Sequence, residues 1–346
     1  MSQYQIQCEA ALLAGDWERA TQAALAWTRY PASVDPRDPR PHFVLNVAHL
    51  MNARFAEAWA SHAECLQGAE DIALVKKWVE GLLAQHADDA PAHLIMGLFL
   101  AQSGQSEQSL QSYKEAARLA PQSAYPHYFL AQIHERAGHL EMAIKEYREA
   151  VRLDPAYAPA RTNLGVAYQE QGRLEMAIPQ YREVIKLNPN DAVAHANLAC
   201  ALAEQGKTQA ALLEYQEALR LNPRDGEVHF ALGGLYETKN RPDLAMKEYR
   251  AAVEAKPDLA AAHSALGWMR FDRGHREEAM ECFNQALKFD PENARAYLGV
   301  AKCYASRGKV QLAIENYTKA IKYEQDPQRK NEIMNNLYKE GGTWDT

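Results

Sequence analysis

A period of 34 residues is the feature that most constrains what this chain can fold into. Prolines keep that interval, and so do a column of glycines with one asparagine and a column of tyrosines with one phenylalanine. The columns are Pro121, Pro155, Pro189, Pro223, Pro257 and Pro291; Gly104, Gly138, Gly172, Gly206, Asn240, Gly274 and Gly308; and Tyr113, Tyr147, Tyr181, Tyr215, Tyr249, Phe283 and Tyr317. Because three residue types keep one period, the chain is built from repeated supersecondary units.

Each unit is expected to contain two helices. In residues 158–191 the first helix begins near Ala158, carries large side chains at Leu164 and Tyr168, and stops at Gly172. A glycine there can take the left-handed conformation that closes a helix. The second helix follows and ends before Pro189, because proline cannot continue a helix.

Small residues recur where the two helices must touch. A side chain no larger than a methyl group lets two helix backbones approach closely, and large neighbours then fill the space around the contact. These residues are Gly165, Ala199, Gly233, Gly267 and Ala301 in the first helices, and Ala143, Ala177, Ala211, Ala245, Ala279 and Ala313 in the second. The repeated pattern therefore encodes packing rather than chemistry.

The complete pattern resembles the tetratricopeptide-repeat family, and the array is similar to the repeat domains of O-GlcNAc transferases. It reads Leu-Gly/Ala, an aromatic residue, the glycine turn, then Ala, Tyr, Ala and Pro. The resemblance implies an all-α protein, a right-handed α-solenoid of helix-turn-helix repeats. Seven units fit: 90–123, 124–157, 158–191, 192–225, 226–259, 260–293 and 294–327. The last unit departs from the pattern, since its proline, Pro327, comes two residues late.

The two ends of the chain fall outside the regular array. Residues 1–89 are expected to form a divergent helical portion of degenerate repeats, either stacked on the array or hinged to it. Within it, 14–31 resembles the end of one repeat, 52–66 resembles a second helix, and the proline-rich 30–41 is expected to be a linker or long loop. Another amphipathic helix, 71–86, precedes the array.

A C-terminal cap is expected in residues 328–346. The segment 328–340 is amphipathic and mostly polar, and its Ile333, Met334 and Leu337 can cover the exposed face of the last repeat. Terminal repeats of solenoids need such a polar outer layer. The last six residues are expected to form a frayed tail.

Composition and charge exclude several classes of function. The formal net charge is −7, so no basic face for nucleic acid is expected. No run approaches the roughly 20 apolar residues of a membrane span, which argues against membrane insertion. The start of the chain lacks the basic and apolar regions of a secretory signal, and the five cysteines (Cys8, Cys65, Cys200, Cys282 and Cys303) are scattered without a CxxC pair. We expect a cytoplasmic protein with reduced thiols.

Catalytic and metal-binding signatures are missing from the sequence. No GxSxG, HExxH or GxxxxGK[ST] motif occurs, so we expect no enzymatic activity and no cofactor. A column of histidines does occupy one repeat position, at His93, His127, His195, His229 and His263. Equivalent residues of stacked helices lie roughly 10 Å apart, too far to share a metal ion. We expect these rings to pack against the preceding repeat.

The resemblance implies a binding surface on the concave side of the array, at positions 2, 5, 6, 9 and 12 of the first helices. The candidate residues there are Tyr125, Tyr128, Phe129, Gln132, Asn163, Val166, Asn197, Phe230, Trp268, Phe271, Arg295 and Lys302. In O-GlcNAc transferases, asparagines at the position of Asn163 and Asn197 form a ladder that binds the backbone of an extended peptide. The alternative is that these two amides solvate an open groove or bond a neighbouring repeat. The aromatic residues are likewise expected either to be exposed or to pack between repeats.

The function expected from this surface is that of a non-enzymatic adaptor. Its groove would hold an extended or helical segment of a partner protein. The alternative is a structural protein that assembles into homo-oligomers, as magnetosome-associated members of the family do.

Overall fold

The computed structural model describes residues 3–29, 38–51 and 69–343. All regular elements in these ranges are helices. The expected helix at 52–66 and most of the expected loop at 30–41 lie outside the described residues.

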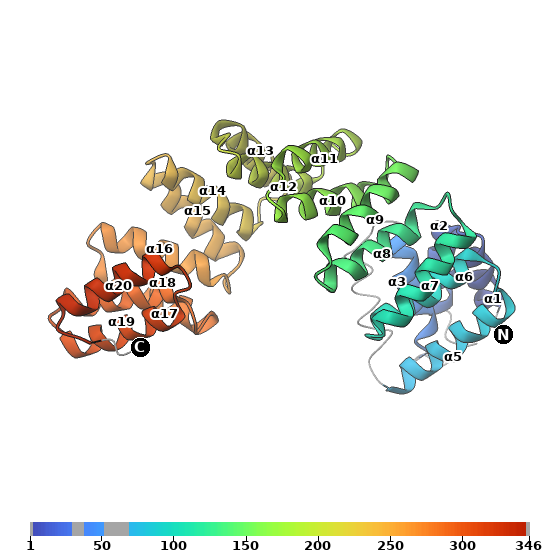
Figure 1. The fold of residues 1–346 in the computed structure, drawn as a ribbon, viewed down its shortest axis with the longest axis horizontal. Coiled ribbons are helices and arrows are strands. Elements are labelled where there is room, and N and C mark those ends of the chain that lie inside the picture. The colour runs from blue at the N-terminus through green and yellow to red at the C-terminus, as the bar shows by residue number, and fades with distance from the viewer. Residues whose placement is uncertain (1–2, 30–37, 52–68, 344–346) are drawn as a thin grey trace. The chain divides into compact units, whose positions relative to one another are not determined.

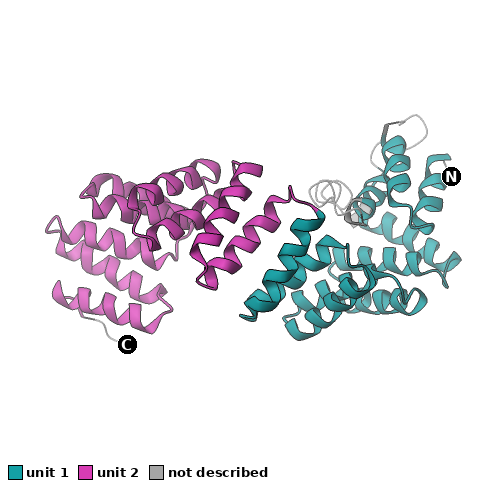
Figure 2. Ribbon diagram, turned by 90° about the horizontal axis from the view of Figure 1, so that it is seen from above, with its two compact units in different colours: residues 1–187 teal, residues 188–346 magenta. Residues whose placement is uncertain are grey.

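The chain divides into two compact units, residues 1–187 and 188–346 (Figure 2). The first unit contains α1 (Gln3–Leu13), α2 (Trp17–Arg29), α3 (Arg40–Met51), α5 (Ala69–Gln85), α6 (Ala90–Gln102), α7 (Ser106–Leu119), α8 (Ala124–Arg136), α9 (Leu140–Leu153), α10 (Ala158–Glu170) and α11 (Leu174–Leu187). The second contains α12 (Ala192–Glu204), α13 (Thr208–Leu221), α14 (Gly226–Thr238), α15 (Pro242–Ala255), α16 (Ala260–Asp272), α17 (Arg276–Phe289), α18 (Ala294–Ala305), α19 (Val310–Tyr323) and α20 (Pro327–Lys339).

Within each unit the helices stack as successive hairpins (Figure 1). Each first helix from α6 to α18 begins at the first residue of an expected repeat, and it packs against the second helix that follows it. Within a unit, first helices also contact the second helix of the preceding repeat, as α8 contacts α7 and α16 contacts α15. The fold is therefore the all-α solenoid of helix pairs that the repeat pattern indicates.

The glycine column closes the first helices in the left-handed conformation. Gly172 has a φ of 69°, and the N–H of Arg173 donates to the carbonyl of Tyr168 at 2.8 Å. This bond satisfies a carbonyl that the end of a helix leaves unpaired. Asn240 takes the same conformation, with a φ of 55°, because asparagine tolerates this region better than other residues that carry a Cβ.

The tyrosine column occupies the space that the small residues leave open. A Cβ added to Gly165 would lie 2.5 Å from the Tyr181 ring, and one added to Gly233 would lie 2.6 Å from the Tyr249 ring. Both tyrosines are buried. The ring of each second helix thus lies directly on the backbone of its own first helix, and this contact holds the hairpin closed.

The N-terminal helices stack on the first hairpin of unit 1. The turn between α1 and α2 again carries a left-handed glycine, Gly15, with a φ of 69°. Phe43 of α3 meets Phe99 of α6 edge-on at 5.9 Å between ring centroids, and Trp17 of α2 meets Tyr125 of α8 at 6.3 Å. Helices α1, α2, α3 and α5 therefore belong to the same compact unit as the first repeats of the array.

The last helix, α20, caps unit 2. Ile333 and Leu337 are buried against Tyr317 and Ile321 of α19. The late proline of the last repeat, Pro327, is the first residue of this helix, where its missing N–H costs nothing. The amphipathic pattern near the C-terminus therefore predicts the cap correctly.

The stacking contact predicts opposite effects for two adjacent glycines. Gly233→Ala places a methyl group against the Tyr249 ring and should destabilise unit 2 by about 1–3 kcal/mol. Gly234→Ala is its matched control, since the nearest atom to the new Cβ is the Tyr249 hydroxyl at 3.8 Å. This variant should gain up to about 1 kcal/mol, because alanine favours the helix. Urea titrations followed by circular dichroism measure both; equal effects would contradict the packing argument.

Candidate functional site

The histidine column ties each first helix to its surroundings. Nδ1 of His127, His195 and His229 lies 2.7 Å from a glutamate of the second helix, at Glu146, Glu214 and Glu248. Nε2 of His195 lies 3.2 Å from the carbonyl oxygen of Pro189, in the preceding repeat. In the part of the chain that the structure describes, no group of three or more His, Cys, Asp or Glu side chains could hold a metal ion. These histidines are structural linkers.

A second polar network runs along the first-helix face, the surface formed by positions 2, 5, 6, 9 and 12 of the first helices. The hydroxyl of Tyr147 donates to Glu135 Oε2 at 2.7 Å, and that of Tyr249 donates to Glu237 Oε2 at 2.7 Å. Burial raises the pKa of both tyrosines, and the hydrogen bond to a carboxylate adds to the shift. Each tyrosine of this kind therefore combines a buried ring with a hydroxyl that is bonded to a carboxylate of the first helix.

Asn163 belongs to this network. Its Nδ2 donates to the Tyr147 hydroxyl of the preceding repeat at 3.2 Å. Of the two open interpretations, bonding to a neighbouring repeat is thus realised at Asn163. Asn197 is half-buried at the same register on α12, and no described residue bonds its side chain.

In unit 1 the candidate aromatic residues form part of the core. Tyr128 is 2% exposed and Phe129 is 4% exposed. Phe129 stacks on Tyr113 with 5.4 Å between centroids, and Tyr128 meets Tyr157 at 5.1 Å. Phe129 therefore packs between repeats, the second of the two alternatives considered for the aromatic residues, whereas Tyr128 is buried by contacts within its own repeat.

The other candidates of unit 1 lie around this core. Tyr125 is half-buried between Trp17 and Tyr157. Gln132 donates its Nε2 to the Tyr128 hydroxyl at 3.0 Å, and Val166 is half-buried on α10. This part of the face is largely occupied by contacts within unit 1.

In unit 2 the structure brings four candidates together as one patch. We call Trp268, Phe271, Arg295 and Lys302 the Trp268 patch. The indole Nε1 donates to the carbonyl oxygen of Arg295 at 3.3 Å, and Lys302 Nζ lies 5.2 Å from the indole centroid. Phe271 meets Trp268 edge-on at 5.8 Å. Both rings are half-buried against the core, Arg295 is exposed, and Lys302 is half-buried.

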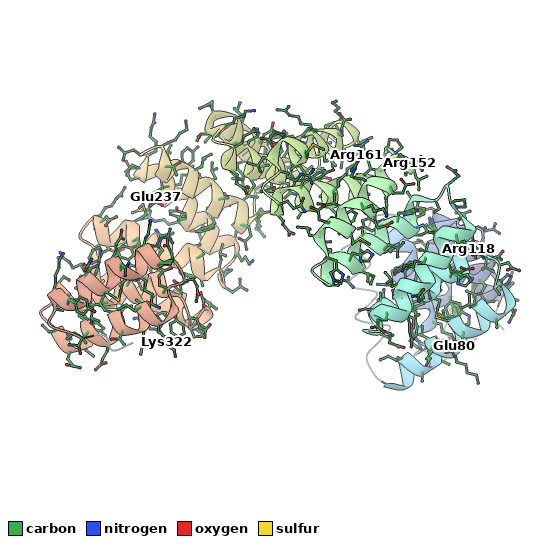
Figure 3. The ribbon with its side chains drawn as sticks, viewed as in Figure 1. Glu80, Arg118, Arg152, Arg161, Glu237 and Lys322 are labelled. Atoms are coloured by element: carbon green, nitrogen blue, oxygen red, sulfur yellow. The ribbon has the colours of Figure 1, made fainter. Side chains whose placement is uncertain are left out.

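A second group of side chains adjoins this patch. Phe230 of α14 packs against Tyr249 with 5.7 Å between centroids, and Glu237 lies exposed near the end of the same helix (Figure 3). Burial raises the pKa of Tyr249, and the charge of Arg295 acts in the opposite direction, so Arg295 lies within electrostatic range of this tyrosine. Aromatic rings, two cations and one carboxylate therefore share the first-helix face of unit 2.

Sequence reasoning missed the glutamates that pair with the histidines. Their signal was present, because Glu146, Glu214 and Glu248 each follow a histidine by 19 residues. The repeat that carries Arg161 in place of histidine has Gln180 at the glutamate position, and Arg161 Nη1 donates to it at 3.2 Å. The pairing is not strict, because the residues 19 positions after His93 and His263 are Ser112 and Cys282.

Four models of one family match the chain. Models described as "Tetratricopeptide repeat" match residues 196–260 and 264–329, 158–191, and 90–123, and a model described as "TPR repeat" matches 136–172. Together they cover more than half of the sequence. The chain belongs to the tetratricopeptide-repeat family.

Solved structures of the same fold agree with this assignment. A tetratricopeptide repeat protein from Parabacteroides merdae is 16% identical, with 73% of this chain and 99% of that chain covered and a TM-score of 0.57. Yeast Tom70 is 14% identical over 98% of this chain and 88% of that chain, with a TM-score of 0.53. PilF of Pseudomonas aeruginosa is 23% identical over 60% and 94%, also with a TM-score of 0.53. No curated protein matches.

A helix that crosses a membrane must be both long and apolar. No helix in the described part of this repeat protein meets both conditions.

The buried tyrosines predict a loss of stability at alkaline pH. Burial raises the pKa of Tyr317 to about 12, from an unfolded value of 10.0. Above pH 10 the unfolded chain therefore loses a proton that the folded chain keeps, so this contribution to stability is complete below pH 10 and is lost as the pH rises toward 12. Each such group changes stability by at most about 1.4 kcal/mol per pH unit.

Thermal melts between pH 9 and 12, with tyrosinate absorbance recorded in parallel, measure this effect. Tyr317→Phe removes one ionising group and should reduce the loss of stability above pH 10. A variant whose melting temperature falls with pH as steeply as that of the wild type would contradict the prediction.

Proposed function

We propose that this tetratricopeptide-repeat protein is a non-enzymatic adaptor, and that the first-helix face of unit 2 binds a segment of a partner protein. The observation that carries the proposal is the Trp268 patch. It combines two aromatic rings that keep part of their surface in solvent with two cationic side chains. Repeat proteins of this architecture commonly bind proteins along such a surface.

The rings of the patch suit a role as anchors. Trp268 and Phe271 are fixed by the core beneath them, so little side-chain freedom remains to be lost on binding. Burying their remaining apolar surface would stabilise a complex by about 25 cal/mol per Å² before the costs of association. Tryptophan and arginine are also enriched among residues that dominate binding energies.

The charges indicate what kind of segment fits. Lys302 lies over the indole, the exposed Arg295 contacts it through its backbone carbonyl, and the two cations would favour a carboxylate in the partner. The expected ligand is therefore an extended segment with acidic residues beside a bulky apolar one. The exposed Glu237 disfavours a second acidic residue toward α14.

A peptide selection tests this proposal. A random peptide library is enriched on the immobilised full chain, and binding of the selected peptides is measured for the wild type and Trp268→Ala. Selected sequences should combine Asp or Glu with an aromatic or large aliphatic residue, and Trp268→Ala should weaken them at least tenfold, the effect of about 1.4 kcal/mol. Lys302→Glu should weaken acidic peptides further.

A matched control lies on a second helix. Lys247→Glu on α15 makes the same charge change outside the first-helix face and should leave binding unchanged. Peptides that bind Trp268→Ala as tightly as the wild type would remove the patch from the site. Self-association is the alternative occupant of this face, and light scattering would reveal it as an oligomer that Trp268→Ala dissociates.

The two asparagines are predicted to differ. Asn163→Ala removes the bond to the Tyr147 hydroxyl and should cost unit 1 about 1 kcal/mol. Asn197→Ala should leave unfolding nearly unchanged and should weaken a bound peptide, because its amide is available to a peptide backbone. Thermal melts together with peptide binding of both variants separate the two roles. A destabilised Asn197→Ala with intact peptide binding would make Asn197 structural.

A further inference from the structure

Unit 1 contains a cavity outside the repeat array. It has a volume of about 410 Å³ and lies between α1, the start of α3 and α5. It is lined by Gln5, Glu9, Leu13, Arg40, Leu74, Lys77, Trp78, Gly81, Leu82, Gln85 and His86. This volume falls in the range of pockets that hold small organic ligands. The wall is about equally polar and apolar, which suits a ligand that carries charged groups beside an apolar one.

Charged groups of both signs are held in place around this cavity. Glu9 Oε1 accepts hydrogen bonds from Gln5 Nε2 at 2.8 Å and from Trp78 Nε1 at 2.7 Å. Arg40 is fixed by two bonds to the buried Asp38, from Nε at 2.9 Å and from Nη2 at 2.7 Å. No described residue donates to Glu9 Oε2 or accepts from Arg40 Nη1, so each group keeps one atom for a ligand.

The charges of Glu9 and Arg40 lie near each other, and Lys77 adds a third charge to the lining of the cavity. The hydrogen bond to Asp38 raises the pKa of Arg40, and the charge of Glu9 adds to it, which places Glu9 within electrostatic range of the guanidinium. Lys77 is exposed, and no described carboxylate pairs with its ammonium group. The cavity therefore offers one anion and two cations.

Gly81 is the second independent observation. It lies inside α5, where glycine is destabilising relative to alanine. Most other interior glycines have a packing reason, as at Gly97, where a Cβ would collide with the Tyr113 ring; Gly234 is an exception. A Cβ on Gly81 would meet no atom of the described residues within 4 Å. A glycine at this position is explained if a ligand in the cavity lies close to the helix backbone, where a side chain would obstruct it.

We propose that this cavity binds a small zwitterion with a large apolar side chain, an amino acid or a dipeptide. Its ammonium group would bond Glu9, its carboxylate would bond Arg40 and Lys77, and its side chain would pack on Trp78, Leu82 and the bare backbone at Gly81. The site is separate from the first-helix face of unit 2. Its test is therefore independent of the adaptor function.

Isothermal titration of the full chain provides the test. The probes are L-leucine and L-leucyl-L-leucine, with 4-methylpentanoate and 3-methylbutylamine as analogues that lack the ammonium or the carboxylate. We expect at least one of the two zwitterions to bind. Each analogue should bind at least about tenfold more weakly, because it lacks one charge-assisted hydrogen bond. Whichever of the two zwitterions binds more tightly identifies the source. Absence of binding by both up to millimolar concentration would overturn the proposal, as would an analogue that binds equally well.

Three variants connect binding to the cavity. Gly81→Leu fills it and should abolish binding, while Gly81→Ala should raise the melting temperature and weaken binding. Glu9→Gln keeps an acceptor for Trp78 but removes the charge, so it should weaken the zwitterion about tenfold and leave 4-methylpentanoate unaffected. Gly234→Ala, the matched helix glycine in unit 2, should bind as the wild type does. Should Gly81→Leu fail to fold, unchanged affinity in Gly81→Ala and Glu9→Gln is sufficient to overturn the proposal.

Discussion

The contact of an aromatic ring with a residue that has almost no side chain is the interaction on which the repeats depend. The ring of Phe283 lies against two first helices, because a Cβ would collide with it both at Gly267 of its own repeat and at Gly299 of the next. One side chain thus sets the spacing within a hairpin and between hairpins. The interior packs as densely as a crystal, so an added methyl group at these glycines must displace the ring or the helix.

On the candidate binding face, the residue twelve positions before the ring varies from repeat to repeat, and it is alanine at Ala101, Ala203 and Ala305. In two repeats the ring carries a hydroxyl that donates to a glutamate twelve residues earlier, at Glu135 and Glu237. In residues 260–293 the ring is Phe283, the glutamate position holds Phe271, and Trp268 lies 5.4 Å from Phe283. In this repeat, aromatic contacts among Trp268, Phe271 and Phe283 replace the hydrogen bond between tyrosine and glutamate.

Much of this architecture could be predicted because each position of the repeat recurs in seven units along the chain. The period indicated where helices begin and where left-handed turns lie, and the family resemblance grouped Trp268, Arg295 and Lys302 on one face. It did not decide between exposure and burial for Phe129 or Asn163. Both occupy position 6, which meets the aromatic ring of the preceding repeat: Phe129 stacks on Tyr113, and Asn163 bonds Tyr147. Whether a side chain at position 6 is free to meet a ligand depends on its contact with that neighbouring ring. The position of a residue along its own helix does not predict this contact.

The N-terminal cavity shows where repeat-based inference has no information. Glu9 and Trp78 are 69 residues apart, and neither occupies a position that the 34-residue pattern repeats. No periodicity therefore links them, yet their side chains share a hydrogen bond. In the repeat array, each residue can be compared with the residues at the same position of the other repeats. A residue that serves packing alone is expected to resemble those residues. Gly81 has no equivalent and no neighbour that requires it, while it costs the helix stability. A destabilising residue that the fold does not need is better explained by what the cavity binds than by how the helix packs.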